Sequence, residues 1–295
     1  PESGTEVFAI DAGDGSSVPA WSSGFPVDMA LERSTASDDM RNAARLISGK
    51  YLITNSTAAE ASNSARVFDY MDGWLSISRS TSNYSWMWKR APGFCDVVAY
   101  SGNGVRGNTV SHNLGVAPEM IWVKSRDDAD FWVVYHSAIG NETKLSLDNV
   151  GVPSGSDFIW WAKTDPTASV FSVGESHRVN GNGENYIAYL FATLPGVSKV
   201  GSYTGNGSSQ IIDCGFTSGA RFVLIKSTTE TRSWCVFDTA RGIVAGNDPV
   251  LYLQDTGAEV TSIDWIDPHS SGFEIVTSQG NINGNGQNYI FYAIA

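Results

Sequence analysis

The feature that most constrains this chain is a residue pattern that occurs twice, about 100 residues apart, which is the spacing of a tandem repeat. Residues 100–104 (Tyr-Ser-Gly-Asn-Gly) return as residues 203–207 (Tyr-Thr-Gly-Asn-Gly), and residues 179–189 return as residues 282–292. Self-similarity at a fixed period indicates that each copy is one structural unit. Because the motif is copied once per unit, we expect it to serve the scaffold rather than one active site.

A third, more diverged copy fills the first part of the 295-residue chain. Its Asn-Tyr pair at 83–84 stands where Asn-Tyr pairs at 185–186 and 288–289 stand in the later copies. Pro-Gly pairs at 92–93 and 195–196 mark the junctions, because both residues interrupt regular structure. We therefore divide the chain into unit 1 (residues 1–94), unit 2 (95–197) and unit 3 (198–295), joined by short links. The start at Pro1, without an initiator Met, predicts an upstream region or a processing step.

The local pattern of the sequence is that of an all-β protein. Short runs rich in β-branched and aromatic residues, such as 120–124, 131–135 and 186–191, are separated by Gly, Asn, Asp and Pro clusters. Asn-Gly pairs at 103–104, 182–183, 206–207 and 285–286 predict tight hairpin turns, because both residues tolerate positive φ. We predict three tandem antiparallel β-sandwiches, with short helices only at 38–48 and 239–245.

Composition restricts the classes of partner. Charged residues make up 17% of the chain, below the roughly 25% of an average soluble domain, and Ser, Thr, Asn and Gly replace them. Such a neutral, hydrogen-bonding surface suits a virion or extracellular setting and contact with carbohydrate. A net charge of −12 argues against nucleic acid as a partner, because phosphate backbones are bound by clustered Lys and Arg. No 18-residue apolar run is present, so we expect no membrane insertion.

Several motifs suggest chemistry that their context does not support. Residues 102–107 match G-x-G-x-x-G, but the residues that follow read as a strand and a turn, not as the helix that dinucleotide binding needs. Three cysteines and four scattered histidines do not form a metal-binding pattern. The acidic segment 126–130 offers oxygen ligands for Ca²⁺ without a D-x-D-x-D-G loop, so a solvated hairpin tip is the preferred interpretation. We expect no cofactor, with Ca²⁺ at this segment as the alternative.

Carboxylates in the loops of units 2 and 3 are the candidates for glycoside hydrolysis. That reaction uses two carboxyl groups roughly 5–10 Å apart across a groove. The candidates are Asp157, Asp165, Glu175, Asp264 and Asp267. The sequence does not give the distances between them, and we do not expect an enzyme.

Tryptophans outside the repeated strands form the candidate ligand site. Trp160, Trp161 and Trp265 lie in corresponding segments, each beside an acidic residue, Asp157 or Asp264, and Trp74 has a similar position in unit 1. Indole rings on a neutral rim can stack on sugar rings while polar neighbours bind the hydroxyl groups. The alternative is that the same indoles close the end of each sandwich core.

Three segments carry a resemblance to a known family. Residues 96–104, 111–124 and 185–192 read Asp-Val-Val-Ala-Tyr-Ser-Gly-Asn-Gly, Ser-His-Asn-Leu-Gly-Val-Ala-Pro-Glu-Met-Ile-Trp-Val-Lys and Asn-Tyr-Ile-Ala-Tyr-Leu-Phe-Ala. The chain resembles a repeat family of tailed bacteriophages, common in marine phage sequences and found in tail fibre and virion structural proteins. The resemblance covers nearly the whole chain, most strongly residues 25–295. It implies a virion component and carries over no catalytic residues.

From this resemblance we expect a tail fibre or adhesion protein that is made in the host cytoplasm, resides in the virion and binds host-surface glycans. Its other partners would be tail or capsid proteins. A purely architectural capsid or tail decoration protein is the first alternative, and a polysaccharide depolymerase is the second. Fibre analogy predicts a homo-oligomer, specifically a trimer.

Overall fold

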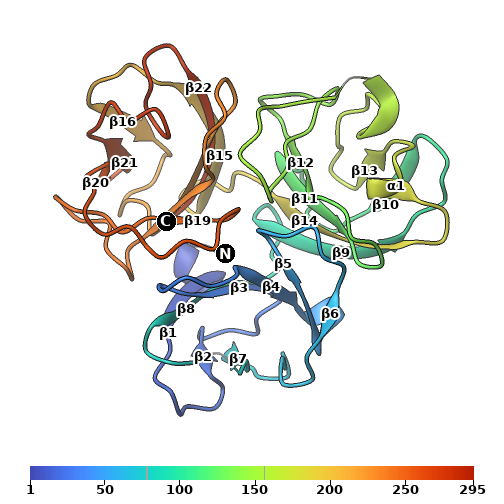
Figure 1. The fold of residues 1–295 in the computed structure, drawn as a ribbon, viewed down its shortest axis with the longest axis horizontal. Coiled ribbons are helices and arrows are strands. Elements are labelled where there is room, and N and C mark those ends of the chain that lie inside the picture. The colour runs from blue at the N-terminus through green and yellow to red at the C-terminus, as the bar shows by residue number, and fades with distance from the viewer. Residues whose placement is uncertain (78, 156) are drawn as a thin grey trace.

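Three β-rich lobes surround a common centre in the computed structural model, which describes residues 1–77, 79–155 and 157–295 (Figure 1). The predicted all-β antiparallel class is confirmed, because every strand pair is antiparallel. In the described residues, helical structure is confined to short turns: η1 (Gly4–Glu6), η2 (Arg45–Ile47), η3 (Asp157–Ile159) and α1 (His177–Asn180). No helix among the described residues is long and apolar enough to cross a membrane.

Each lobe contributes one inner sheet that faces the centre of the molecule. The three inner sheets have matching strand orders: β1-β8-β3-β4-β5-β6 in unit 1, β9-β14-β11-β12 in unit 2 and β15-β22-β17-β18-β19 in unit 3. Their bounds are β1 (Phe8–Ala12), β3 (Met29–Ser34), β4 (Arg41–Ala44), β5 (Lys50–Ile53), β6 (Ala61–Ser62), β8 (Asn83–Trp88), β9 (Cys95–Ser101), β11 (Met120–Ser125), β12 (Val133–His136), β14 (Asn185–Phe191), β15 (Ser198–Thr204), β17 (Phe222–Ser227), β18 (Cys235–Asp238), β19 (Leu251–Tyr252) and β22 (Asn288–Ile294).

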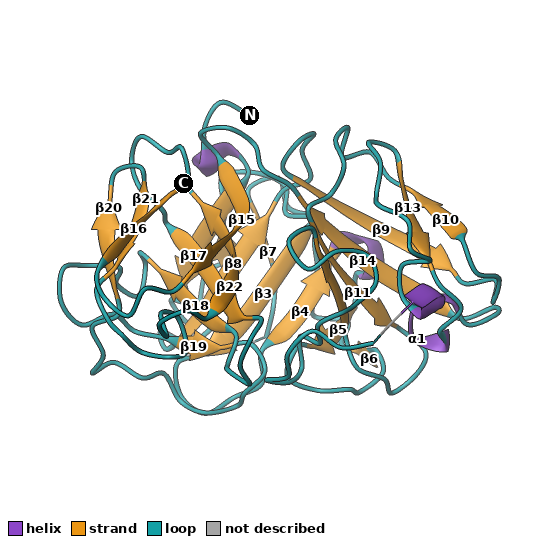
Figure 2. Ribbon diagram, turned by 90° about the horizontal axis from the view of Figure 1, so that it is seen from above, coloured by secondary structure: helices purple, strands orange, loops and turns teal. Residues whose placement is uncertain are grey.

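A smaller outer sheet covers the other face of each inner sheet and completes a sandwich. These sheets are β2-β7, β10-β13 and β16-β21-β20 in units 1, 2 and 3. Their bounds are β2 (Trp21–Ser22), β7 (Gly73–Trp74), β10 (Asn108–Ser111), β13 (Val170–Val173), β16 (Gln210–Asp213), β20 (Ile266–His269) and β21 (Gly272–Ile275). In Figure 2 the strands lie between two layers of loops.

The inner faces of the three inner sheets share one hydrophobic core. Aromatic rings meet there across unit boundaries: the centroids of Trp88 and Phe222 are 5.6 Å apart, and those of Phe191 and Tyr292 are 5.0 Å apart. Each unit has a second, separate core between its inner and outer sheets. The central strands β11 and β17 are therefore buried on both faces along their whole length, which explains their almost continuous apolar sequences.

Head-to-tail contacts close the three units into a ring. Glu60 of unit 1 donates its backbone N–H to the Arg126 carbonyl of unit 2 at 2.9 Å, and Arg232 of unit 3 donates to the Val150 carbonyl of unit 2 at 3.0 Å. Thr35 of unit 1 accepts from the N–H of Glu259 in unit 3 at 2.8 Å. Both chain ends lie beside this last interface, where Arg221 donates to the carbonyls of Phe8 and Ala295 (Figure 1). The units thus form one closed body rather than a row.

One carbonyl at the start of each interface accepts a side-chain hydrogen bond from the next unit. Trp132, just before β12, donates its indole N–H to Ile53 at 2.9 Å, and Trp234, just before β18, donates to Ser146 at 3.0 Å. Met40 precedes β4 at the third position and has no such donor. There Arg33 donates to the Tyr252 carbonyl at 2.9 Å instead. Unit 1 therefore lacks the tryptophan of the other two units, but the carbonyl of Tyr252, which corresponds to those of Ile53 and Ser146, still accepts a hydrogen bond.

The two predicted helices are wrong for a tertiary reason. Residues 41–44 of the first segment form β4, whose side chains from Asn42 to Ala44 are buried, and only η2 follows it. Residues 239–245 form turns and irregular structure. In the first segment Ala43 and Ala44 favour a helix locally, but pairing with β3 and burial in the core override that preference.

His136 gives the fold a specific response to acid. Its ring is 1% exposed and its Nδ1 accepts the N–H of Ala138 at 3.1 Å. Burial lowers the pKa to about 4, although the nearby Phe291 carbonyl acts in the opposite direction. Because the unfolded imidazole titrates near 6.5, the stabilisation is complete above that pH and is lost as the pH falls towards 4, by up to about 3 kcal/mol.

Chemical denaturation of wild type and His136→Gln at pH 7 and pH 4.5 measures how much of the acid-induced loss of stability comes from His136. Burial raises the pKa of Asp248 to about 6. Protonation of this carboxyl group therefore stabilises the folded protein as the pH falls through part of the same range, which opposes the effect of His136. The informative quantity is therefore the difference between the two proteins. We expect acid to destabilise wild type more than the variant. Equal acid-induced losses would contradict the assignment to His136.

Candidate functional site

The tryptophans predicted to stack on sugars lie in the cores. Trp160, Trp161 and Trp265 are 6%, 1% and 8% exposed, and Trp161 donates its indole N–H to the Thr143 carbonyl at 3.1 Å. Trp74 is also fully buried, stacked on Phe68 between the two sheets of unit 1. Their faces contact protein rather than solvent, so in this fold these indoles have no exposed ring face on which a sugar could stack. The alternative drawn from the sequence, that they close the sandwich cores, describes them.

The predicted carboxylates do not assemble into a site with those indoles. Asp264 is exposed next to the buried Trp265, and the Asp157 side chain lies outside the described part of the structure. Asp165 accepts a hydrogen bond from Asn141, and Glu175 is exposed at the surface of unit 2. None of the four candidates whose side chains the structure describes lines the cavities described below.

The repeated Tyr, Asn and Gly motif stabilises the scaffold. The buried Asn283 amide donates to the carbonyls of Ser208 and Thr277 at 2.7 and 2.6 Å and accepts the N–H of Asn206 at 3.0 Å. Tyr203 stacks on Tyr289 with ring centroids 5.1 Å apart. The corresponding Asn and Tyr residues of unit 2 make the same contacts with their own loop. The motif thus joins a hairpin loop to the sheet in each of the two units.

The acidic segment at 126–130 is occupied by contacts within the chain. Asp130 lies 2.7 Å from Arg178 and 2.9 Å from His177, and Asp127 accepts hydrogen bonds from Asn185. Arg126 pairs with Glu60 across the boundary of units 1 and 2. Within residues 1–77, 79–155 and 157–295, no three His, Cys, Asp or Glu side chains converge as a metal-binding group.

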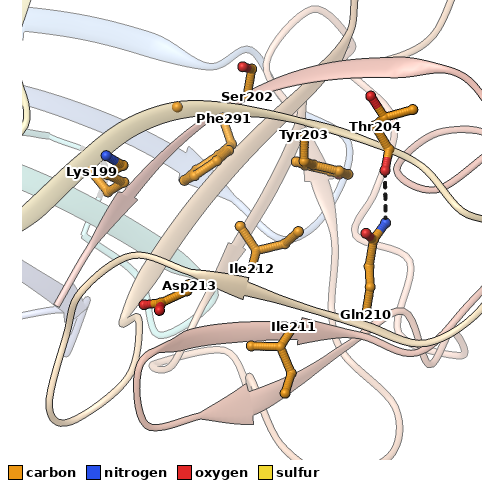
Figure 3. A pocket seen from close by; sticks show the side chains of 10 residues that line it. Lys199, Ser202, Tyr203, Thr204, Gln210, Ile211, Ile212, Asp213 and Phe291 are labelled. Carbon is orange, nitrogen blue, oxygen red and sulfur yellow. Dashed lines mark hydrogen bonds between the residues drawn. The ribbon is translucent and has the colours of Figure 1, made fainter.

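An open cavity of about 490 Å³ lies between the two sheets of unit 3, at the edge formed by β15 and β16 (Figure 3). Its volume is in the range of roughly 300–1,000 Å³ that small-molecule sites occupy. Polar side chains from both strands surround an apolar floor. The lining residues are Lys199, Gly201, Ser202, Tyr203, Thr204, Gln210, Ile211, Ile212, Asp213 and Phe291. We call this cavity the β15 groove.

Gly201 and Phe291 form the floor of the β15 groove as a cross-strand pair. A Cβ atom on Gly201 would lie 2.7 Å from the Phe291 ring, so the ring occupies the place that a side chain on β15 would take. The paired residues at this position in unit 2 are Val98 and Ala188, with the larger side chain on the opposite strand. This exchange of sizes leaves β15 bare at Gly201 and brings an aromatic ring to the groove.

Lys199 and Asp213 give the β15 groove one cation and one anion. No described carboxylate forms an ion pair with Lys199, and Asp213 accepts one hydrogen bond, from the N–H of Gly215 at 2.8 Å. Gln210 is positioned by its own contacts, because its amide donates to Asn283 at 2.6 Å and to the Thr204 carbonyl at 3.4 Å. The groove therefore presents two charged groups that are free to bind a ligand, beside a fixed amide. The hydroxyl groups of Tyr203 and Thr204 instead donate to the Ile282 carbonyl and to the Asn288 side chain, at 2.6 and 2.9 Å.

Two further cavities lie at related places in the molecule, one next to the β15 groove and one in unit 1. A cavity of about 320 Å³ lies on the other side of β15, where Ala138 and Ile139 of unit 2 approach unit 3. In unit 1, the corresponding sandwich edge between β1 and β2 holds a cavity of about 430 Å³, lined by Asp11, Asp14 and Asp72 among others. The sandwich edge is thus hollow in units 1 and 3, with different charges.

The residues of the β15 groove were not predicted from the sequence. Their signal is a coupled departure from the repeat, because Gly201 replaces Val98 and Phe291 replaces Ala188 in the same pair of strands. A single departure would be ordinary divergence. A small residue opposite a new aromatic ring instead indicates a reshaped surface.

Comparison with known proteins gives a family but no functional assignment. Neither the curated proteins nor the solved structures contain a match to this chain. A family model described as a domain of unknown function, DUF7483, matches residues 8–295, which include nearly all of the three units. The chain therefore belongs to the DUF7483 family.

Proposed function

We propose that this protein is a structural component of a bacteriophage virion, a tail fibre or adhesion protein that binds host-surface glycans in the β15 groove. The resemblance of its repeats to tailed-phage virion proteins supports the first part. Tail or capsid proteins are its partners in the particle, and it acts outside the host cell. Assembly as a homotrimer belongs to the same proposal and rests on fibre analogy.

The chemistry of the β15 groove is the observation that carries glycan binding. A sugar ring has apolar C–H surfaces and a rim of hydroxyl groups, so its site needs an apolar floor with polar groups around it. Phe291 and Ile212, which are 4% and 7% exposed, close the bottom of the groove, and the 52% exposed Ile211 supplies apolar surface at its rim. Lys199, Gln210 and Asp213 supply donors and acceptors. These residues lie on or beside strands of a closed ring and are already ordered, so little conformational entropy is lost when a ligand binds.

Binding fits this groove better than hydrolysis. Glycoside hydrolysis needs two carboxyl groups on either side of the scissile bond. Asp213 is the one carboxylate among the described residues that line the β15 groove. A depolymerase that used this groove would therefore lack the second catalytic carboxyl group. The architectural alternative draws on a different observation, since the repeated motif and the predicted indoles both serve the scaffold.

An array of bacterial surface polysaccharides, probed with the purified protein, tests the proposal. We expect saturable binding to acidic or neutral polysaccharides of host bacteria and about a tenfold loss in Asp213→Ala, because a charge-assisted hydrogen bond is worth roughly 1.4 kcal/mol or more. Asp264→Ala is the matched control, since it removes an exposed carboxylate of the same unit outside the groove.

The outcomes separate the alternatives. A folded wild type that binds no polysaccharide on the array contradicts the adhesin proposal and favours the architectural role. Binding that is weakened by Asp264→Ala but not by Asp213→Ala moves the site away from the β15 groove. Release of shortened chains from a bound polysaccharide would establish a depolymerase.

A further inference from the structure

Two cavities meet at the edge of β15. The β15 groove and the 320 Å³ cavity beside unit 2 both touch Ser202, Tyr203 and Thr204. Side chains of a strand alternate between its two faces, so Tyr203 faces the sandwich while Ser202 and Thr204 face the neighbouring unit. β15 is the last strand of its sheet, and its outer edge separates the two cavities. A ligand longer than one cavity would therefore have to cross this edge.

On the outer edge of β15, Ser202 is the residue whose backbone N–H and carbonyl both lack a partner among the described residues, and the Thr204 N–H beside it lacks one as well. The Thr193 hydroxyl group contacts both the N–H and the carbonyl of Val200, at 3.2 and 3.3 Å, and Gln210 donates to the Thr204 carbonyl. These contacts show that Val200 and Thr204 point their backbone groups away from β22. Because direction alternates along a strand, Ser202 between them also points outward. No described residue pairs with the Ser202 N–H or carbonyl on that side.

The short free stretch formed by Ser202 and the Thr204 N–H decides which kind of polymer this edge accepts. An added peptide strand gains its affinity from a row of main-chain hydrogen bonds. Thr193 and Gln210 interrupt that row on either side of Ser202. A sugar chain does not need a continuous row of main-chain hydrogen bonds, because its hydroxyl groups can pair with the isolated N–H and carbonyl of Ser202. The edge therefore favours a glycan over an extended peptide.

The charge of Lys199 adds a second property of the ligand. Its ammonium group lines the β15 groove and has no ion-pair partner among the described residues (Figure 3). An acidic sugar brings a carboxylate that can pair with this cation, and its ring hydroxyls can donate to Asp213. A neutral sugar would leave Lys199 unused in the bound state.

We infer that the ligand is a linear uronic-acid polysaccharide that crosses the β15 edge at Ser202. One acidic sugar occupies the β15 groove with its carboxylate on Lys199, and the following sugars lie in the second cavity against Ala138 and Ile139 of unit 2. The site thus joins two units of the ring and binds the interior of a chain. This inference rests on the proposed function and specifies its substrate class.

Isothermal titration with oligosaccharides of defined length tests the inference. The probes are oligogalacturonates and oligomannuronates of one, three and six residues, with neutral cello-oligosaccharides of equal length. We expect hexamers of at least one uronate to bind at least tenfold more tightly than its monomer and than the neutral hexamer. Lys199→Met should reduce uronate affinity at least tenfold and leave neutral binding unchanged.

A second variant isolates the crossing of β15. Ala138 is exposed and lines only the second cavity, so Ala138→Trp fills that cavity with little effect on the fold, and Ala138→Ser is its matched control. In the tryptophan variant we expect the hexamer to bind no better than the monomer, while monomer affinity stays that of wild type.

Three results would overturn the inference. These are equal affinity for neutral and acidic chains, affinity that does not rise with length, and binding of neither uronate series. Saturable binding of another polysaccharide on the array would then leave the adhesin proposal standing with a different ligand. A protein that binds no glycan in either experiment would contradict both. An extended peptide that binds at β15 and adds sheet structure would replace the glycan.

Discussion

Replacing Trp234 with alanine is expected to lower the free energy of unfolding by about 3–5 kcal/mol, the usual effect of removing a buried tryptophan. The side chain is 1% exposed in the central core, and its indole N–H donates to the Ser146 carbonyl of unit 2 at 3.0 Å. The substitution thus removes packing from the core and a hydrogen bond from the contact between units 2 and 3. Urea denaturation followed by circular dichroism measures the loss.

Trp234→Met separates the two contributions, because unit 1 has Met40 at the corresponding position. Methionine retains much of the apolar packing but leaves the Ser146 carbonyl without its donor. We expect a smaller loss, of about 1–3 kcal/mol. A loss below 1 kcal/mol in the alanine variant would contradict the claim that a shared central core holds the units together.

Arg66→Met is expected to destabilise the protein by about 3–5 kcal/mol, because it leaves a buried carboxyl without its partner. Arg66 and Glu32 form an ion pair inside unit 1, and both side chains are 1% exposed. Burial raises the pKa of Glu32, an effect that the positive charge of Arg66 opposes. Thermal unfolding at neutral pH measures the loss, which should diminish in acid as the carboxyl group becomes protonated.

The repeat supplies the control for this prediction. Val123 and Ile225 occupy the position of Glu32 in the second and third inner sheets, because each pairs with the first residue of the strand that follows in the chain. The double variant Glu32→Val/Arg66→Met should therefore recover most of the stability that Arg66→Met loses, since an apolar pair replaces the ion pair. A double variant as unstable as the single one would show that packing around Arg66, rather than its charge, is what the single substitution removes.

The strands of this protein follow from its sequence because their signals are local. Residues 120–125 and 222–227 read as apolar runs between turn residues and form β11 and β17. The shared core does not follow from the same signals. A run buried on both faces has the same pattern whether its second face meets an outer sheet or another unit. The closed ring depends on contacts between segments far apart in the chain, such as Trp132 with Ile53.

The candidate site was harder to predict than the strands. A tryptophan beside an aspartate in a loop, such as Trp265 beside Asp264, has the same sequence whether its ring faces sugar or protein. Burial decides between these, and burial of a loop residue depends on the whole fold. The β15 groove arises from Gly201 and Phe291 on neighbouring strands, so its shape becomes apparent only when the register is known.

Backbone amide NMR shifts during titration with the polysaccharide that binds best on the array test the central claim most directly. We predict that the largest changes fall on the amides of Ser202, Thr204 and Gln210, with smaller changes at Ala138 across the boundary of units 2 and 3. Changes confined to other residues, with the β15 groove unaffected, would contradict the claim that this groove is the binding site.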